Sequence, residues 1–313
     1  MLYIESPSDS KIDKYYQDIK DKISFRLGSA QLSAEIINHF NEKKVERIIK
    51  DKPNELILHH IEFMTRFVDL PQNDIAQKEQ IISGLKSVFN YNEIISDSKS
   101  TSYELAKITN RNTCTYCNRL YTNTIEYRDP QTNRINVSTR ITRAVFDHWF
   151  CKKEYPLLAL SFYNLIPSCS VCNSSIKGDD EFGLSTHIHP YIDNVVTDFS
   201  FSYQPKTLFE NEIVIKQNNS NNKLKRTLEE LKIKEVYNAH SNLELKDLID
   251  LNEKYNSTYI NTLFNETFRN LNMDETEIYR LIFGIESNEK EFYKRPFSKF
   301  KKDIIQELRG IQI

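Results

Sequence analysis

The stretch of sequence that decides the fold opens with Cys114-Thr-Tyr-Cys117 and closes with Cys169-Ser-Val-Cys172-Asn173-Ser-Ser-Ile-Lys177-Gly178. A two-residue spacer lets both sulfur atoms of one turn face the same point, so two Cys-x-x-Cys pairs can surround one tetrahedral ion. Zinc is the ion that four thiolates favour in this arrangement. We therefore predict a structural Zn²⁺ bound by Cys114, Cys117, Cys169 and Cys172.

The segment between the two pairs, residues 118–168, is longer than the roughly 15 to 20 residues that separate the pairs of ordinary zinc ribbons. Something else is therefore built between them. The alternative is that these cysteines are only small buried hydrophobic side chains, but the repeated spacing around one polar segment disfavours it. The fifth cysteine, Cys151, lies outside this spacing and is interpreted as a half-buried thiol.

Side chains suited to phosphodiester hydrolysis lie between and just after the cysteine pairs. Asp147 offers a hard oxygen ligand for Mg²⁺ or a similar ion, and the adjacent His148 can take a proton from water near neutral pH. Asn164 and Asn173 offer neutral amide oxygens that can orient a loop or complete the coordination of a metal. Because neighbours on a strand point to opposite faces, we expect Asp147 and His148 to lie where a strand ends or bends.

In this order of residues the chain resembles the HNH, or ββα-metal, endonucleases in their zinc-stapled form, over roughly residues 111–191. That family has Asp-His at the end of a first short strand and Asn-Leu on the second strand. A Cys-x-x-Cys pair followed by Asn and Lys-Gly then opens a helix. The matching residues here are Asp147-His148, Asn164-Leu165, and the run from Cys169 to Gly178.

The resemblance implies a metal-dependent endonuclease with His148 as general base. Asp147 and Asn173 would hold a catalytic Mg²⁺ or Mn²⁺, and Asn164 would steady the loop and orient the histidine. Asn173 stands where the family has the final histidine of its name, and asparagine occurs there in many members. The resemblance also implies DNA ahead of RNA as the substrate.

Two histidines follow this region in His187-Ile-His189-Pro-Tyr191. Imidazole suits zinc or a nuclease metal, so His189 is a candidate ligand, although four cysteines already satisfy a zinc ion. This segment, Tyr237-Asn-Ala-His240 and Arg295-Pro-Phe-Ser-Lys299 together resemble HNH proteins encoded beside ATPases, Septu-type and retron-associated effectors among them. That resemblance implies an anti-phage defence effector with an ATPase partner.

The whole chain is predicted to be α+β and mostly helical, with a central zinc-stapled ββα core, added β-hairpins and helical flanks. We expect an N-terminal helical region over 1–110, with helices near 32–40, 54–67 and 73–89. The nuclease core is expected over 111–198, with a hairpin formed by 120–127 and 134–139. Residues 199–313 are expected to form a second hairpin, from 199–203 and 212–215, and further helices.

Composition narrows the possible partners. The chain has a net charge of −2, whereas a typical nucleic-acid-binding domain has a broad basic surface and a pI above about 9. Any nucleic acid would therefore be held by local basic patches. The first residues do not form a signal peptide, and no apolar run is long enough to cross a bilayer. Cysteines in metal-type spacing also fit a reducing compartment. We expect a soluble, cytoplasmic protein without a membrane partner.

A zinc-stabilised module that binds nucleic acid or a partner protein without catalysis is the alternative function. The near-neutral charge and the large helical flanks favour it. The occurrence of Asp147, His148 and both asparagines in the order of the nuclease family favours the enzyme.

Overall fold

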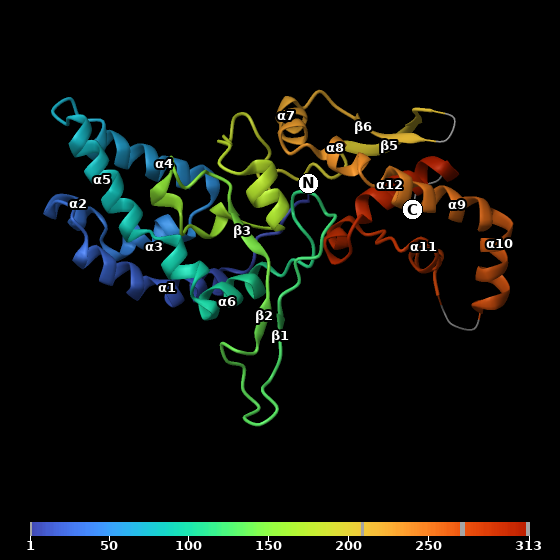
Figure 1. The fold of residues 1–313 in the computed structure, drawn as a ribbon, viewed down its shortest axis with the longest axis horizontal. Coiled ribbons are helices and arrows are strands. Elements are labelled where there is room, and N and C mark those ends of the chain that lie inside the picture. The colour runs from blue at the N-terminus through green and yellow to red at the C-terminus, as the bar shows by residue number, and fades with distance from the viewer. Residues whose placement is uncertain (1, 208–209, 270–272, 311–313) are drawn as a thin grey trace. The chain divides into compact units, whose positions relative to one another are not determined.

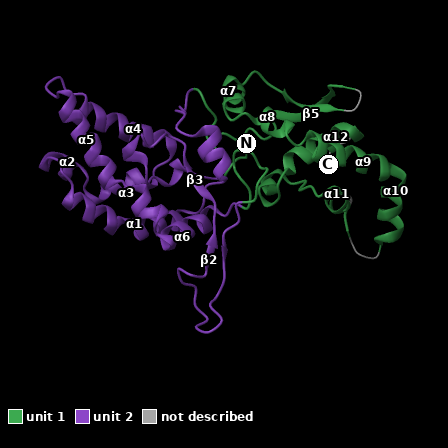
Figure 2. Ribbon diagram, viewed as in Figure 1, with its two compact units in different colours: residues 1–4, 112–121, 186–313 green, residues 5–111, 122–185 purple. Residues whose placement is uncertain are grey.

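The computed structural model describes residues 2–207, 210–269 and 273–310. The chain is α+β and predominantly helical, as predicted, and its described strands form small antiparallel sheets. Two compact units are present (Figure 2). Unit 2 contains Glu5–Arg111 and Thr122–Ser185, and unit 1 contains Met1–Ile4, Asn112–Tyr121 and Thr186–Ile313.

The N-terminal part of unit 2 is a set of helices (Figure 1). They are α1 (Asp9–Ser29), α2 (Ala34–His39), α3 (Glu42–Lys50), α4 (Pro53–Phe63), α5 (Ile75–Val88) and α6 (Lys99–Thr109), with single π-type turns η1 (Met64–Val68) and η2 (Asn92–Ser96). Local signals explain where α5 begins, because Asp74 and Gln77 form a reciprocal capping box. The helices predicted near 32–40, 54–67 and 73–89 are confirmed.

Helix α1 organises the core of this helical region. Its buried side chains recur every three or four residues, so one apolar face packs against α3, α5 and α6. Two hydrogen bonds also attach residues 156–164 to these helices. Tyr15 donates to the carbonyl of Leu160 at 2.7 Å, and Ser161 donates to the carbonyl of Ile48 at 2.6 Å. The N-terminal helices therefore support the segment that follows the Asp-His strand.

The central strands of unit 2 are β3 (Val145–His148) and β4 (Leu165–Ser168). They pair antiparallel, with Asp147 opposite Ile166 and His148 opposite Leu165. The short 3₁₀ turns η3 (Pro156–Leu158) and η4 (Phe162–Asn164) lie in their connection, and the π-type helix η5 (Val171–Lys177) follows β4. Gly178 ends η5 with a φ of 53°, a backbone conformation that glycine adopts without steric cost.

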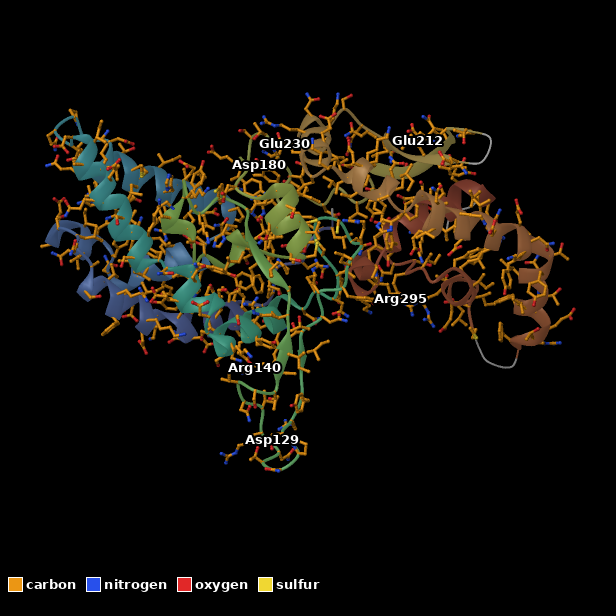
Figure 3. The ribbon with its side chains drawn as sticks, in the orientation of Figure 1. Asp129, Arg140, Asp180, Glu212, Glu230 and Arg295 are labelled. Carbon is orange, nitrogen blue, oxygen red and sulfur yellow. The ribbon has the colours of Figure 1, made fainter. Side chains whose placement is uncertain are left out.

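A second hairpin of unit 2 is formed by β1 (Ile125–Glu126) and β2 (Arg140–Thr142). The predicted hairpin exists, but its strands are shorter than expected and the return strand begins at Arg140. Side chains in the intervening loop form hydrogen bonds with nearby backbone amides, so these amides do not form hydrogen bonds between the two strands. Asp129 accepts from the amides of Gln131 and Thr132, and Asn136 accepts from Ser138. Figure 3 shows Asp129 at the far end of the hairpin.

Unit 1 is built on the hairpin of β5 (Phe199–Pro205) and β6 (Asn211–Gln217), which confirms the second predicted hairpin. Its helices are α7 (Asn222–Glu230), α8 (Ile233–Asn238), α9 (Lys246–Lys254), α10 (Ser257–Thr262), α11 (Glu275–Phe283) and α12 (Ser298–Arg309), with the turns η6 (Ser241–Leu245), η7 (Leu263–Thr267) and η9 (Glu289–Lys294). The Phe201 ring joins this sheet to the helices, with centroids 4.3 Å from Tyr237 and 5.5 Å from Phe300.

The helices in the described parts of the chain are all too short or too polar to span a bilayer.

Candidate functional site

The four cysteines of the two Cys-x-x-Cys pairs are buried, and their sulfur atoms all lie within 4.8 Å of one another. Zinc–sulfur bonds of about 2.3 Å in a tetrahedron would place the sulfur atoms roughly 3.8 Å apart. The cluster therefore needs little adjustment to take an ion. The four residues are positioned to bind a metal such as zinc, as the spacing predicts. Among the described residues, this is the group of His, Cys, Asp and Glu side chains that could hold a metal.

Backbone amides in both pairs point at sulfur. The amide of Arg119 lies 3.5 Å from Cys117 Sγ, and the amide of Cys172 lies 3.4 Å from Cys169 Sγ. Such N–H···S bonds favour the charged thiolate, which is the form that binds metal.

The first pair is held in place by Asn118 and Tyr237. Asn118 has a φ of 50°, and its side-chain amide donates to Thr113 Oγ1 and to the carbonyls of Phe292 and Arg295. Tyr237 donates to the carbonyl of Cys117 at 2.7 Å. Spacing alone did not indicate the contacts with Phe292, Arg295 and Tyr237, because these partners lie more than one hundred residues away in the chain.

Asp147, His148 and Asn173 line one hollow of about 390 Å³ in unit 2. The expectation that the Asp-His pair lies at a strand end is confirmed, because β3 ends at His148. Asn173 comes from η5 and directly follows Cys172, so the second cysteine pair sets its position. Three side chains expected to act together are thus brought together by two elements.

The ring of His148 is buried and held on two sides. Its Nε2 lies 3.0 Å from the carbonyl oxygen of Ala159, and the Tyr91 ring packs edge-on at 4.5 Å between centroids. A carbonyl only accepts, so Nε2 carries the proton and Nδ1 carries the lone pair of the neutral ring. Burial, with the charges of Lys152 and Lys177, lowers the pKa of His148 to about 3 despite the Ala159 bond. The ring is neutral at pH 7.

Asp147 is buried beside an equally buried lysine. Lys177 Nζ lies 3.3 Å from Asp147 Oδ2 and donates to the carbonyl of His148 at 2.9 Å. The same ammonium sits 5.0 Å from the centroid of the Phe182 ring. Pairing and hydrogen bonding offset the cost of burying both charges.

Asn164 has no exposed surface and cross-links the chain between β3 and β4. Its Oδ1 accepts from the amide of Phe150 at 2.7 Å, and its Nδ2 donates to the carbonyls of Phe150 and Leu158 at 3.2 and 2.9 Å. Through these bonds Asn164 links Phe150, at the start of the β3–β4 connection, to Leu158, the residue before Ala159. The carbonyl that orients His148 is therefore fixed by Asn164.

The two later histidines lie in unit 1 and have other contacts. His187 places its Nε2 2.8 Å from Glu230 and its Nδ1 2.9 Å from Thr186 Oγ1. His189 is fully buried, and its Nδ1 accepts from the amide of Tyr191 at 3.2 Å. Ligation of a metal by His189 stays a prediction.

Several residues that sequence reasoning missed also line the hollow. Tyr91, Asn92 and Ser96 reach it from the N-terminal helical region, and Arg143 and Lys152 add positive charge. Arg143 is anchored by donation to the carbonyl of Ala144 at 2.7 Å. Only the mild excess of basic residues around the Asp-His pair could have indicated the two cations. No sequence pattern around Tyr91 indicated that this residue would line the hollow.

Comparison with known proteins gave no match to a family model, a curated protein or a solved structure.

Proposed function

We propose that this protein is a metal-dependent endonuclease of the HNH type that hydrolyses phosphodiester bonds in nucleic acid, with DNA as the expected substrate. The observation that carries the proposal is the convergence of Asp147, His148 and Asn173 on one hollow. A carboxylate, a neutral imidazole and an amide in a polar hollow with Arg143 and Lys152 suit a phosphate substrate. Packing of a hydrophobic core alone would not require these polar and charged side chains to lie together.

His148 acts as the general base in this proposal. Its Nε2–H bond to Ala159 sets the ring so that Nδ1 can take a proton from the attacking water. The three bonds of Asn164 hold the connection that carries Ala159. A base whose ring cannot swing keeps its lone pair aligned through the reaction.

Asp147 and Asn173 would hold the divalent ion. One carboxylate and one amide oxygen fit the preference of Mg²⁺, which keeps several waters and takes few protein ligands. When bound, Mg²⁺ or Mn²⁺ supplies positive charge against the phosphate and leaving oxygens. Arg143 and Lys152 can add charge on the same hollow.

The four cysteines have a structural function in this proposal. A closed set of four thiolates leaves no open position on zinc for a substrate or water. Zinc instead fixes the turn at Cys169 and Cys172, and with it Asn173.

The test is incubation of the purified, zinc-loaded chain with plasmid, single-stranded DNA and total RNA, with and without Mn²⁺. We expect metal-dependent cutting that His148→Ala abolishes while the circular dichroism spectrum and zinc content stay unchanged. A matched His240→Ala variant should cut like the parent, because His240 does not line the hollow. Equal cutting by His148→Ala would eliminate the assigned base.

The second candidate is a zinc-stabilised module that binds nucleic acid or protein and cuts nothing. One observation favours it: Lys177 already neutralises Asp147, as a metal would. Calorimetric titration of the zinc-loaded chain with Mn²⁺ separates the two candidates. Saturable binding that needs Asn173 supports the nuclease, and absence of binding supports the module.

The anti-phage function and the ATPase partner implied by the resemblance belong to this proposal. If an ATPase gene lies beside its own, as the resemblance implies, expression of the two in bacteria should reduce phage plaques, and His148→Ala should remove the protection. Protection that persists in His148→Ala would separate defence from the proposed chemistry.

A further inference from the structure

A second hollow, of about 260 Å³, adjoins the Asp147–His148 hollow in unit 2. The two share Tyr91, Asn92 and Lys152 as lining residues. Lys86, Lys153 and Phe89 line only the second one, which we call the lysine hollow. Its position makes it the neighbouring subsite for any chain that passes through the first hollow.

The charge of the lysine hollow selects anions. Lys86, Lys152 and Lys153 line it, and no Asp or Glu is among its lining residues. Lys153 pairs with Asp179, while Lys152 Nζ lies 5.7 Å from the centroid of the Tyr91 ring. Surface lysines are ordinary by themselves. Three around one concavity, beside a site suited to phosphodiesters, indicate a place for a backbone phosphate.

The floor of the lysine hollow is apolar. Phe89, Pro156 and Ala159 are buried there, and the partly accessible Tyr91 offers an aromatic ring. Inorganic phosphate or a bare backbone would make no use of such a floor. A nucleobase would, because its faces are apolar and aromatic while its edges can bond the exposed amide of Asn92. The volume lies just below the roughly 300–1,000 Å³ of drug-sized ligand pockets and suits one nucleotide.

We propose that the lysine hollow binds one unpaired nucleotide of the substrate, with its base against the ring of Tyr91 and its phosphate on Lys86 and Lys152. A base inside a duplex must be unpaired and unstacked before it can enter such a hollow, and this costs free energy. In a single strand the base is already unpaired, so most of this cost is absent. The preferred substrate is therefore single-stranded or locally unpaired nucleic acid. The position of this nucleotide next to the cleaved bond rests on the proposed function; its binding does not.

Binding is measured by fluorescence anisotropy on the zinc-loaded full chain carrying His148→Ala, so that cleavage cannot interfere. The probes are labelled single strands of DNA and RNA, roughly 12 nucleotides long, and the duplex of the same DNA sequence. We expect the Kd of at least one single strand to be about tenfold lower than that of the duplex. Equal affinity for the duplex and both single strands would overturn the proposal.

Charge reversal tests the location of the site. Lys86→Glu should raise the Kd of the single strand about tenfold. Lys78→Glu makes the same change in net charge on the same helix but outside the hollow, and should stay within about twofold of the parent. Lys86 is exposed, and Lys78 loses only a surface ion pair with Asp69, so neither variant threatens the fold. Equal effects of the two variants would place the strand elsewhere.

A competition experiment tests the apolar floor. Adenosine and cytidine monophosphates should displace the labelled strand at lower concentration than inorganic phosphate at equal ionic strength. Equal displacement by all three would remove the base from the hollow.

Cleavage assays separate this inference from the proposed function. If the chain with His148 intact cuts nothing while binding still depends on Lys86, the nuclease proposal falls and the nucleotide site stands. If it cuts duplex DNA faster than single strands, and Lys86→Glu cuts like the parent, the nucleotide site falls and the nuclease stands.

Discussion

Lys177 and Asp147 form a buried ion pair, with Nζ 3.3 Å from Oδ2 and less than a twentieth of either side chain exposed. The Lys177 ammonium thus provides a positive charge beside Asp147, the carboxylate that we propose as a metal ligand. Because Asp147 lines the candidate active site, stability and metal binding should be linked there.

Lys177→Met should destabilise unit 2 by about 3–5 kcal/mol, because it removes the ammonium that pairs with the buried Asp147 charge. Saturating Mn²⁺, at about one hundred times its Kd, should restore about 2.7 kcal/mol if Asp147 binds it. Urea unfolding of the zinc-loaded chain, with and without Mn²⁺, measures both effects.

The double variant Lys177→Met with Asp147→Asn is the matched control. It removes both charges, so it should unfold at higher urea than the single variant and should not respond to Mn²⁺. An equal Mn²⁺ response in both proteins would place the metal away from Asp147.

Asn164→Ala should lower kcat more than it changes KM, because Asn164 fixes the carbonyl that orients His148 and does not line the hollow. The loss of three buried hydrogen bonds should also cost about 2–4 kcal/mol of stability. Steady-state kinetics and urea unfolding measure these effects. Asn218→Ala removes one exposed side-chain bond, to the Thr197 carbonyl in unit 1, and should leave kcat unchanged.

Cys169→Ser should release zinc and lower the solubility of the chain, because three thiolates bind the ion more weakly and Cys169 is buried in the cluster. Zinc content by mass spectrometry gives the outcome. Cys151→Ser is the control, since Cys151 is buried but does not belong to the cluster, and it should retain one zinc per chain. A folded, soluble Cys169→Ser chain without zinc would contradict a structural metal.

His60 should make the stability of unit 2 sensitive to acid. Burial lowers its pKa from 6.5 to about 4, and its ring packs 4.7 Å from that of Tyr155. As the pH falls below 6.5 the unfolded chain takes up this proton first, so the stabilisation present at neutral pH is lost progressively towards pH 4. With partial solvent contact allowed for, the loss is about 2 kcal/mol.

The variant His60→Phe keeps the ring and removes the titration. Urea unfolding at pH 7.5 and pH 4.5 should show a smaller difference for the variant than for the parent. His148 has a pKa shifted in the same direction, but it is present in both proteins and cancels in the comparison. An identical pH dependence would show that His60 does not contribute.

Short-range physics allowed part of this molecule to be predicted. The apolar spacing along α5 depends on residues within one or two turns, so the helix near 73–89 could be predicted. The second hairpin was predicted for the same reason. The capping box of Asp74 and Gln77 is equally local, although it was not predicted. The first hairpin was placed less well, because side chains such as Asn136 bond to the local backbone in a way that alternation does not reveal.

The sequence by itself determined which groups are available: two cysteine pairs with metal-binding spacing, an adjacent carboxylate and imidazole, and two asparagines. Only the tertiary structure decided that Tyr91 packs on His148 and that Lys177 neutralises Asp147. It also decided that Lys86 shares a hollow with Lys152. The reason is physical. Spacing constrains neighbours within a turn or a strand, whereas contacts between distant segments depend on how whole apolar faces pack, which no local pattern records.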